Sequence, residues 1–313
     1  MINLVDVEGA AARIAPHIRR TPVLKASALA EPVTEARLSL KLENLQVTGS
    51  FKARGASNKL LSLPPEAVSR GIVTASGGNH GLAVARAARM AGVPATVFVT
   101  ESASVEKREK LRRWGARVEV LGAVWHEANA AAVAQATATG AAYFHPFADP
   151  QVVAGQGTVA LEFLEAVPDL EVILVAIGGG GLISGMSVVL KALKPSIRII
   201  GIEPTGSPTL KASLDAKRVV HLDRVTSRVA TMSCAETDPA VFSLIRDHVD
   251  EVVLVTDEQM QAAAEWLWFE LGIAADLSGA AAIAALQSGA VILSEGTQCG
   301  ALVCGAGPEG IMR

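Results

Sequence analysis

Short apolar runs alternate with amphipathic helical patterns along the chain from about residue 38 onward. The runs predict strands at residues 38–42, 72–75, 95–100, 116–121 and 197–203. The intervening patterns predict helices from residue 51, at 79–92 and at 104–114. Such alternation is typical of parallel strands joined by crossover helices. We therefore expect an α/β protein with open, mostly parallel sheets.

Residues 172–190 carry no charge and are long enough to raise the question of a membrane span. Four consecutive glycines in the middle of this segment argue against a continuous helix. We expect a buried strand, a glycine loop and a helix instead, and no membrane partner.

A length of 313 residues leaves room for about two domains with a substantial core. We expect a small domain at residues 43–142 and a large domain built from residues 1–42 and 143–313. Hydrophobic residues make up 50% and aromatics 4%, so the core must consist mostly of aliphatic side chains. This composition suits an α/β protein.

The charge balance excludes a broad basic surface, because 28 Lys and Arg stand against 31 Asp and Glu. We therefore expect no nucleic-acid partner. The three cysteines, Cys234, Cys299 and Cys304, have neither zinc-site nor disulfide-scaffold spacing. Asp6 and Glu8 make the N-terminus unlike a signal peptide. Together these features predict a cytoplasmic protein.

Lys52 falls in the first turn of a predicted helix that begins at Phe51 and that Ser50 can cap. A cation at this end opposes the helix dipole. One interpretation is an exposed lysine whose stem covers apolar surface. The other is that the dipole and burial lower the pKa of the amine, which makes Lys52 a nucleophile able to form a Schiff base.

The glycine run at residues 178–181 lies between a predicted strand and a helix, where backbone N–H groups can converge on a phosphate. It does not satisfy G-x-G-x-x-G, because Ile183 or Ser184 occupies the place of the last glycine. The dinucleotide interpretation is weakened accordingly, although Glu203 at the end of the next strand suits a ribose contact.

A second glycine turn, SGGNHG at residues 76–81, also joins a predicted strand to a helix. It can be a turn with an Asn cap. It can equally present amide and hydroxyl donors to a carboxylate or a phenolic oxygen.

Taken together, these motifs resemble those of the serine/threonine dehydratases, which are pyridoxal-phosphate enzymes of the tryptophan-synthase β type (fold type II). The resemblance runs from about residue 21 to the C-terminus. It rests on the order and spacing of five motifs, namely SFKARG at 50–55, SGGNHG at 76–81, HPF at 145–147, GQGT at 155–158 and the tetraglycine run at 178–181.

The resemblance implies that Lys52 carries pyridoxal 5'-phosphate as a Schiff base and that Asn79 bonds the ring hydroxyl. Cys304 falls where most relatives have a serine or threonine facing the pyridine nitrogen, and mammalian-type serine dehydratases have cysteine there. Its alternative role is that of a small buried thiol. The phosphate would be held by Gly178, Gly179, Gly180 and Gly181.

The substrate carboxylate would be received by the loop that contains Ser76, Asn79 and His80. Gly77 stands where serine racemases place a reprotonating serine, so racemisation is not expected. The segment around Glu203 and Thr209 lacks the second carboxylate of metal-binding relatives. We therefore expect no divalent metal site, since hard cations need several oxygen ligands.

Two further departures concern the later part of the chain. Residues 230–232 read Ala-Thr-Met where Ala-Asp-Gly is usual, and Asp276 replaces the usual glutamate before the small-residue run at 278–280. They suggest a divergent subgroup, specialised for a hydroxylated amino acid such as one met in hydroxyectoine breakdown.

The implied activity is elimination of water and ammonia from a β-hydroxy amino acid such as L-threonine or L-serine, which gives a 2-oxo acid. The implied partners are this small substrate and further copies of the chain in a homodimer or homotetramer. Two alternatives stay open: a cysteine-synthase-like β-replacement enzyme, and a nucleotide-binding or regulatory module without covalent cofactor.

Overall fold

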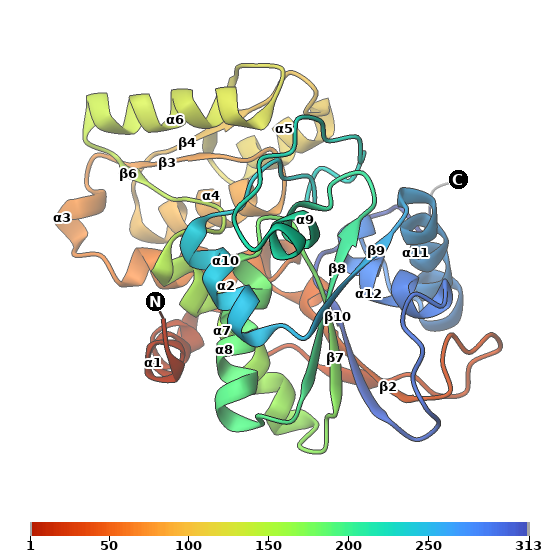
Figure 1. Ribbon diagram of the computed structural model, residues 1–313. Coiled ribbons are helices and arrows are strands. Elements are labelled where there is room, and N and C mark those ends of the chain that lie inside the picture. Colours follow the sequence, from red (N-terminus) through yellow and green to blue (C-terminus); the bar gives the residue numbers. More distant parts are fainter. Residues whose placement is uncertain (1, 312–313) are drawn as a thin grey trace.

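The computed structural model describes residues 2–311, which form two separate β-sheets (Figure 1). Within this range the larger sheet has six strands in the order β1-β2-β10-β7-β8-β9. All neighbours are parallel except β1, which runs antiparallel to β2 at one edge. The strands are β1 (Val23–Lys25), β2 (Arg37–Leu42), β10 (Gln298–Val303), β7 (Val172–Ala176), β8 (Arg198–Pro204) and β9 (Glu251–Val255).

The smaller sheet of the described chain has four strands in the order β5-β4-β3-β6, all of them parallel. Its strands are β5 (Ala116–Val120), β4 (Ala95–Val99), β3 (Ile72–Ala75) and β6 (Ala142–Tyr143). The expected α/β class with mostly parallel sheets is confirmed. The division of the chain at residues 43 and 142 stays a prediction.

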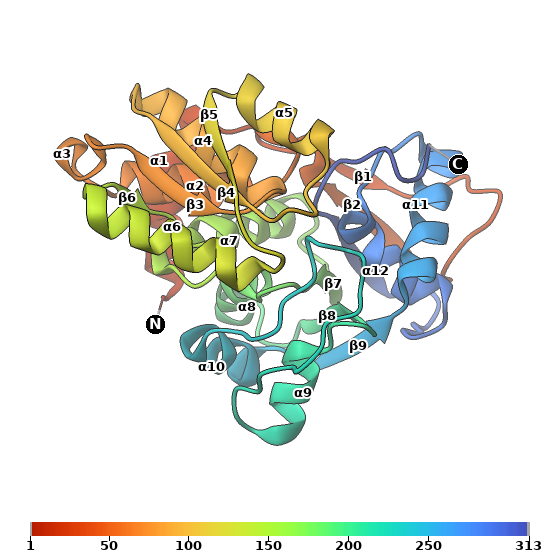
Figure 2. The same ribbon diagram turned by 90° about the horizontal axis from the view of Figure 1, so that it is seen from above.

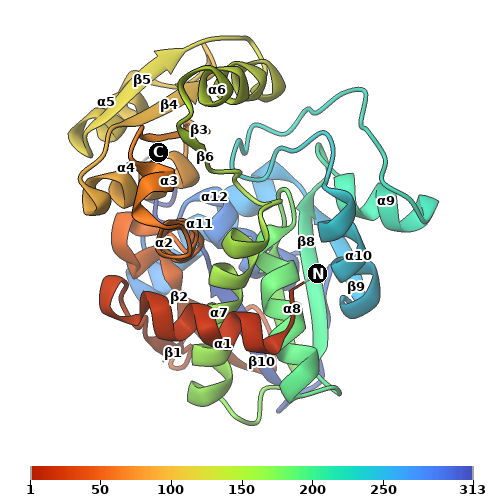
Figure 3. The ribbon, with the colours of Figure 1, turned by 90° about the vertical axis from the view of Figure 1, so that its left-hand side faces the viewer.

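Helices cover both faces of each sheet. In the larger sheet α12 lies against β7 and β10, with α11 outside it, while α7 and α8 cover the opposite face (Figure 1). The helix α1 packs across α7 (Figure 3). In the smaller sheet α6 covers one face, and α4 and α5 cover the other (Figure 2). The helices are α1 (Leu4–Ile14), α2 (Lys52–Leu61), α3 (Pro65–Val68), α4 (Asn79–Ala91), α5 (Val105–Arg113), α6 (Trp125–Thr139), α7 (Pro150–Ala166), α8 (Gly181–Leu193), α9 (Thr209–Ala216), α10 (Pro239–His248), α11 (Asp257–Leu271) and α12 (Leu277–Gln287), with short 3-10 turns at Ala15–His17, Glu43–Leu45 and Val47–Gly49.

Residues 172–190 carry no charge because they lie in the core around the larger sheet. Every residue of β7 is buried, because helices cover both faces of this central parallel strand. The glycine run then forms the loop that separates β7 from α8, which begins at Gly181. The expected strand, loop and helix at residues 172–190 are therefore confirmed. Among residues 2–311 no helix combines the length and the apolar character needed to cross a membrane.

The start of α2 differs from its prediction. The helix begins at Lys52, and its N-cap Phe51 makes no side-chain capping bond. Ser50 does not cap it: its backbone is extended at φ −163° and forms an isolated antiparallel β-bridge to Gly305, and Phe51 takes the N-cap position. The Ser50 hydroxyl is buried without a partner among the described residues.

Candidate active site

Three of the predicted site segments begin where a strand ends. Ser76 follows β3, Gly178 lies two residues after β7, and Cys304 follows β10. Ligands of open α/β sheets bind outside the carboxyl ends of their strands. The two sheets contribute to one place, because a side-chain carbon built at Gly305 would lie 2.9 Å from Asn79 Nδ2.

Lys52 is held at the start of α2 by contacts on both sides of it. The N–H of the preceding residue, Phe51, donates to the Cys304 carbonyl at 3.3 Å, which ties the helix start to the end of β10. The Lys52 Nζ donates to the carbonyl oxygen of Pro146 at 2.7 Å. The amine is therefore directed toward the segment that carries the HPF motif.

The ionisation of Lys52 is shifted by its surroundings. Burial lowers the pKa of its amine from 10.5 to about 8. An amine with this pKa is partly neutral near pH 8 and can act as a nucleophile or a base. This finding favours the interpretation of Lys52 as a reactive group over that of a solvated surface lysine.

The glycine loop at residues 178–181 joins β7 to α8. Gly180 is the N-cap of α8 with φ +92°, and no side chain caps the helix. A side-chain carbon at Gly179 would lie 2.2 Å from the ring of Phe147, so only glycine fits there without a shift. The first backbone N–H groups of α8 thus lack both a side-chain cap and intrahelical partners, as in phosphate-binding loops.

The turn at residues 76–81 joins β3 to α4, which begins at Asn79. The Ser76 Oγ accepts the N–H of Gly78 at 3.3 Å, and Asn79 Nδ2 donates to Asp276 Oδ2 at 2.9 Å. The N-cap Gly78 leaves the helix start without a side-chain cap. Backbone donors at the start of α4 can therefore bind an anion.

His80 is buried beneath this turn with only 2% of its surface exposed. Its Nε2 lies 3.1 Å from the Phe144 carbonyl oxygen. Because a carbonyl only accepts, Nε2 carries the hydrogen and Nδ1 is left as an acceptor. Burial, followed by the charge of Lys52, lowers the pKa of His80 to about 3, so the ring is neutral. Its side chain cannot donate to a carboxylate through Nδ1.

Cys304 is buried at the end of β10 and belongs to a chain of hydrogen bonds. Its Sγ donates to Ser278 Oγ at 3.6 Å, and Ser278 Oγ donates to Asp276 Oδ1 at 2.6 Å. Burial, followed by the charge of Asp276, raises the pKa of the Cys304 thiol. Cys304 therefore presents a neutral thiol.

Glu203 caps the start of α9. Its carboxylate accepts the N–H groups of Leu210 at 2.8 Å and Lys211 at 2.9 Å, and burial raises its pKa to about 7. The Thr209 hydroxyl is bonded to the carbonyl of Cys234. Across residues 2–311 no group of three or more His, Cys, Asp or Glu side chains is placed to hold a metal ion. The independence from divalent metal stays a prediction.

Three groups form hydrogen bonds in the site although the sequence motifs predict no role for them. The Pro146 carbonyl accepts from Lys52, and the Ser278 hydroxyl joins Cys304 to Asp276. Thr237 Oγ1 donates to the Gly179 carbonyl at 3.1 Å. Pro146 could have been suspected from the HPF motif and Ser278 from the run after Asp276. Thr237 lies in no motif.

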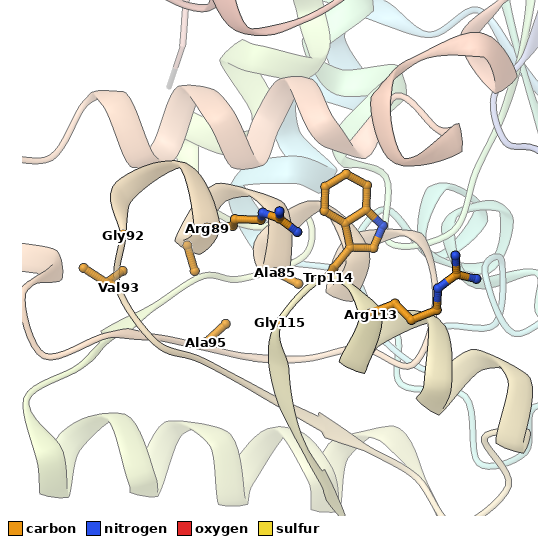
Figure 4. A pocket seen from close by; sticks show the side chains of 9 residues that line it. Ala85, Arg89, Gly92, Val93, Ala95, Arg113, Trp114 and Gly115 are labelled. Atoms are coloured by element: carbon orange, nitrogen blue, oxygen red, sulfur yellow. The ribbon is translucent and has the colours of Figure 1, made fainter.

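A surface pocket on the smaller sheet lies apart from these residues (Figure 4). This pocket has a volume of about 320 Å³, and Arg89, Arg113 and Trp114 are among its lining residues. A neighbouring cavity of about 310 Å³ shares these three side chains and is also lined by Lys110. The three cations sit in the last turns of α4 and α5, where they offset the negative ends of the helix dipoles. Helix-end electrostatics therefore accounts for them without a ligand.

Comparison with known proteins gives consistent matches over nearly the whole chain. The family model "Pyridoxal-phosphate dependent enzyme" matches residues 14–305. The chain is 40% identical to an L-threonine ammonia-lyase from Thermotoga maritima over 91% of this chain and 71% of that protein. It is 38% identical to a catabolic L-threonine dehydratase from Staphylococcus aureus over 93% of this chain and 84% of that one. A maize serine racemase structure superposes with a TM-score of 0.92 at 35% identity, covering 97% and 93% of the two chains.

The chain belongs to the pyridoxal-phosphate dependent enzyme family, and its fold is fold type II. Within this family it is a lyase of the ammonia-lyase and dehydratase group, with pyridoxal phosphate as its cofactor. The hypothesis of a regulatory module without covalent cofactor is therefore wrong.

The residues present fit this cofactor. The uncapped start of α8 lies in a loop from which Phe147 excludes any side chain at Gly179, which leaves its amides open to a phosphate. Lys52 supplies an amine of lowered pKa for the aldehyde. Two further polar atoms are buried without partners within residues 2–311: the Nδ1 of His80, whose ring is close enough to feel the charge of Lys52, and the hydroxyl of Ser50, two residues before Lys52 in the chain.

Proposed function

We propose that this enzyme dehydrates and deaminates L-threonine, L-serine or a related β-hydroxy amino acid to a 2-oxo acid and ammonia. The names of the Thermotoga and Staphylococcus relatives support threonine as the first substrate to test. The single observation that carries the proposal is the Lys52 amine, with a pKa of about 8, directed at the Pro146 carbonyl between the two sheets.

Lys52 would hold the cofactor covalently and then act as the base. When bound, pyridoxal phosphate supplies the electron sink that makes the substrate Cα–H acidic. Once the substrate amine has displaced Lys52, the Lys52 amine is free to remove the Cα proton. Its lowered pKa keeps much of this amine unprotonated near pH 8. Loss of the β-hydroxyl and hydrolysis then give the 2-oxo acid and ammonia.

Three elements would bind the cofactor. The phosphate would lie on the amides of residues 178–181 at the start of α8. Asn79 would bond the ring hydroxyl, and Cys304 would face the pyridine nitrogen as a neutral thiol. The cofactor would thus lie between a small domain at residues 43–142 and the rest of the chain.

The substrate carboxylate would be bound by the turn at residues 76–81. Ser76 and Asn79 offer side-chain donors, and the start of α4 offers uncapped amides. The His80 ring donates to the Phe144 carbonyl and has no second hydrogen to offer. We therefore assign the contact of His80 with the substrate carboxylate to its backbone N–H. The enzyme would act in the cytoplasm as a homodimer or homotetramer.

The test is a screen of β-hydroxy amino acids, with ammonia and 2-oxo acid measured together. We expect equal amounts of both from L-threonine or L-serine, and no loss of activity with a chelator of divalent cations. Lys52→Ala serves as the inactive control. A hydroxylated amino acid preferred over both would identify the specialised subgroup.

A competing nucleophile such as sulfide distinguishes β-elimination from β-replacement. Elimination predicts that ammonia release persists when sulfide is present. A new amino acid formed with little ammonia would instead identify a β-replacement enzyme and overturn the proposal.

A further inference from the structure

Asp276 lies at the meeting point of the residues proposed to touch the two sides of the cofactor ring. Its Oδ2 accepts from Asn79 Nδ2 at 2.9 Å. Its Oδ1 accepts from Ser278 Oγ at 2.6 Å and from the Gly279 N–H at 2.7 Å. Its own N–H donates to the carbonyl of Gly305 at 3.0 Å. Asp276 is therefore bonded to α4, to α12 and to the end of β10.

The Asp276 carboxylate is buried, with 8% of the residue exposed. Within residues 2–311 it forms no salt bridge to a Lys, Arg or His side chain. It is satisfied by hydrogen-bond donors alone. A buried carboxylate held in this way dictates the direction of each bond around it, since an ionised carboxylate can only accept.

The first dictated direction is that of the Asn79 amide. With Oδ2 of Asp276 facing it, the amide must turn its NH₂ group toward Asp276, because the opposite orientation would set two acceptors against each other. The orientation of the remaining amide atoms toward the ring hydroxyl is thereby fixed.

The second dictated direction runs through Ser278 to Cys304. The Ser278 hydroxyl has one hydrogen and gives it to Asp276. Its oxygen is then left to accept from the thiol of Cys304, whose Sγ lies 3.6 Å away. Cys304 therefore donates to Ser278, Ser278 donates to Asp276, and the Asp276 carboxylate is the final acceptor.

We propose that Asp276 is a positioning residue, which acts through Asn79 and through Ser278 and Cys304 to fix the hydrogen bonds on both sides of the cofactor ring. This inference rests on the proposed function, because it requires Asn79 and Cys304 to face the ring. The role proposed for Asp276 passes through these neighbours and needs no contact of its own with the cofactor.

The test is Asp276→Asn. Asn is as good an N-cap as Asp, so α12 keeps its cap and the fold is retained. The new amide NH₂ would face that of Asn79 and force the Asn79 amide to turn over. We expect an affinity for pyridoxal phosphate about five- to tenfold weaker, as for one lost hydrogen bond, together with a shift of the visible band of the bound cofactor.

Two further variants make the result specific. Asp238→Asn removes the same charge from the N-cap of α10, where Oδ1 accepts two backbone N–H groups, and should leave affinity and band unchanged. In an Asn79→Ala background, Asp276→Asn should weaken binding by less than it does in the native protein, because part of its action passes through Asn79.

An unchanged affinity and band in Asp276→Asn would overturn the inference. So would an effect that is undiminished when Asn79 is already absent. A native protein that shows no visible band with cofactor would instead contradict the proposed function on which the inference rests.

Discussion

The position of Lys52 in its helix can be predicted from the sequence, whereas its hydrogen-bond partner cannot. Its place in the first turn of a helix follows from the local pattern, and so does the direction of its pKa shift if the residue is buried. Its hydrogen-bond partner, the carbonyl of Pro146, is 94 residues away and follows from no local pattern.

The lowered pKa of Lys52 predicts how fast the cofactor-free protein takes up pyridoxal phosphate at different pH values. The neutral amine attacks the aldehyde, so the rate should rise with pH and level off above about 8, rather than near 10.5. Stopped-flow absorbance between pH 6 and 10 measures this. A rate that still rises tenfold per pH unit above pH 9 would show that the amine is not shifted.

Gly77 predicts that the enzyme does not racemise its substrate. A base on one face of the substrate returns a proton to that face alone, and Gly77 carries no side chain to supply one on the other. Its Cα–H also points toward Ala103, whose Cβ would lie 3.3 Å from an added carbon. Chiral analysis after long incubation with L-serine should show little D-serine. Substantial D-serine would identify another acid in the site.

Ser50 and Asp276 show where prediction from single residues ends. Ser50 has the residue type of a helix cap, but its backbone pairs with Gly305, distant in sequence, and its hydroxyl makes no bond to α2. In the sequence, Asp276 stands out only because it replaces the usual glutamate. In the structure, its bonds to Asn79 and Ser278 join α4 to α12. Both outcomes depend on contacts between distant segments.

At the scale of elements, the glycine loop before α8 could be predicted because strand, glycine run and helix adjoin in the sequence. The reason for glycine at each position could not. At Gly179 it is the ring of Phe147, which belongs to another motif 32 residues earlier.

Gly179→Ala should therefore weaken cofactor binding. The added carbon would lie 2.2 Å from Phe147, so the loop or the ring must move, at a cost of about 1 to 3 kcal/mol. We expect about tenfold weaker affinity by fluorescence titration. Gly9→Ala in α1 is the control, because nothing lies within 4 Å of its added carbon. Equal affinities for both variants would contradict the assignment of this loop to the phosphate.

The helix α2 is anchored by a buried network of ion pairs around Arg54, two residues after Lys52. Arg54 has no exposed side-chain surface and pairs with Glu43 at 2.8 Å and Glu162 at 2.7 Å. Glu162 also pairs with Lys41 at 2.6 Å. The network joins α2 to β2, the turn after it and α7.

Arg54→Met should destabilise the protein strongly, because it leaves Glu43 buried without its partner. We expect a loss of about 3 to 5 kcal/mol in the free energy of unfolding. Arg198→Met, which breaks the exposed pair with Glu251, should cost less than about 1 kcal/mol. Denaturant titration compares the two. A loss for Arg54→Met no greater than for Arg198→Met would contradict the anchoring role.

For the whole molecule, the sequence predicts which segments form strands better than how they assemble. Glycines and polar turns bound the short apolar runs, so β3 is predicted without error and β4 and β5 to within one residue. The order of the larger sheet could not be read in this way. It places β10 between β2 and β7, which pairs segments more than 120 residues apart.

The account depends on Lys52 as the residue that carries the cofactor, and reduction with borohydride followed by peptide mapping tests this directly. We predict that the label is found on Lys52 and is lost in Lys52→Ala. The other lysine with a lowered pKa, Lys41, is paired with Glu162 and should stay unlabelled. Label on Lys41, or a native protein that acquires no visible band after incubation with pyridoxal phosphate, would contradict the account.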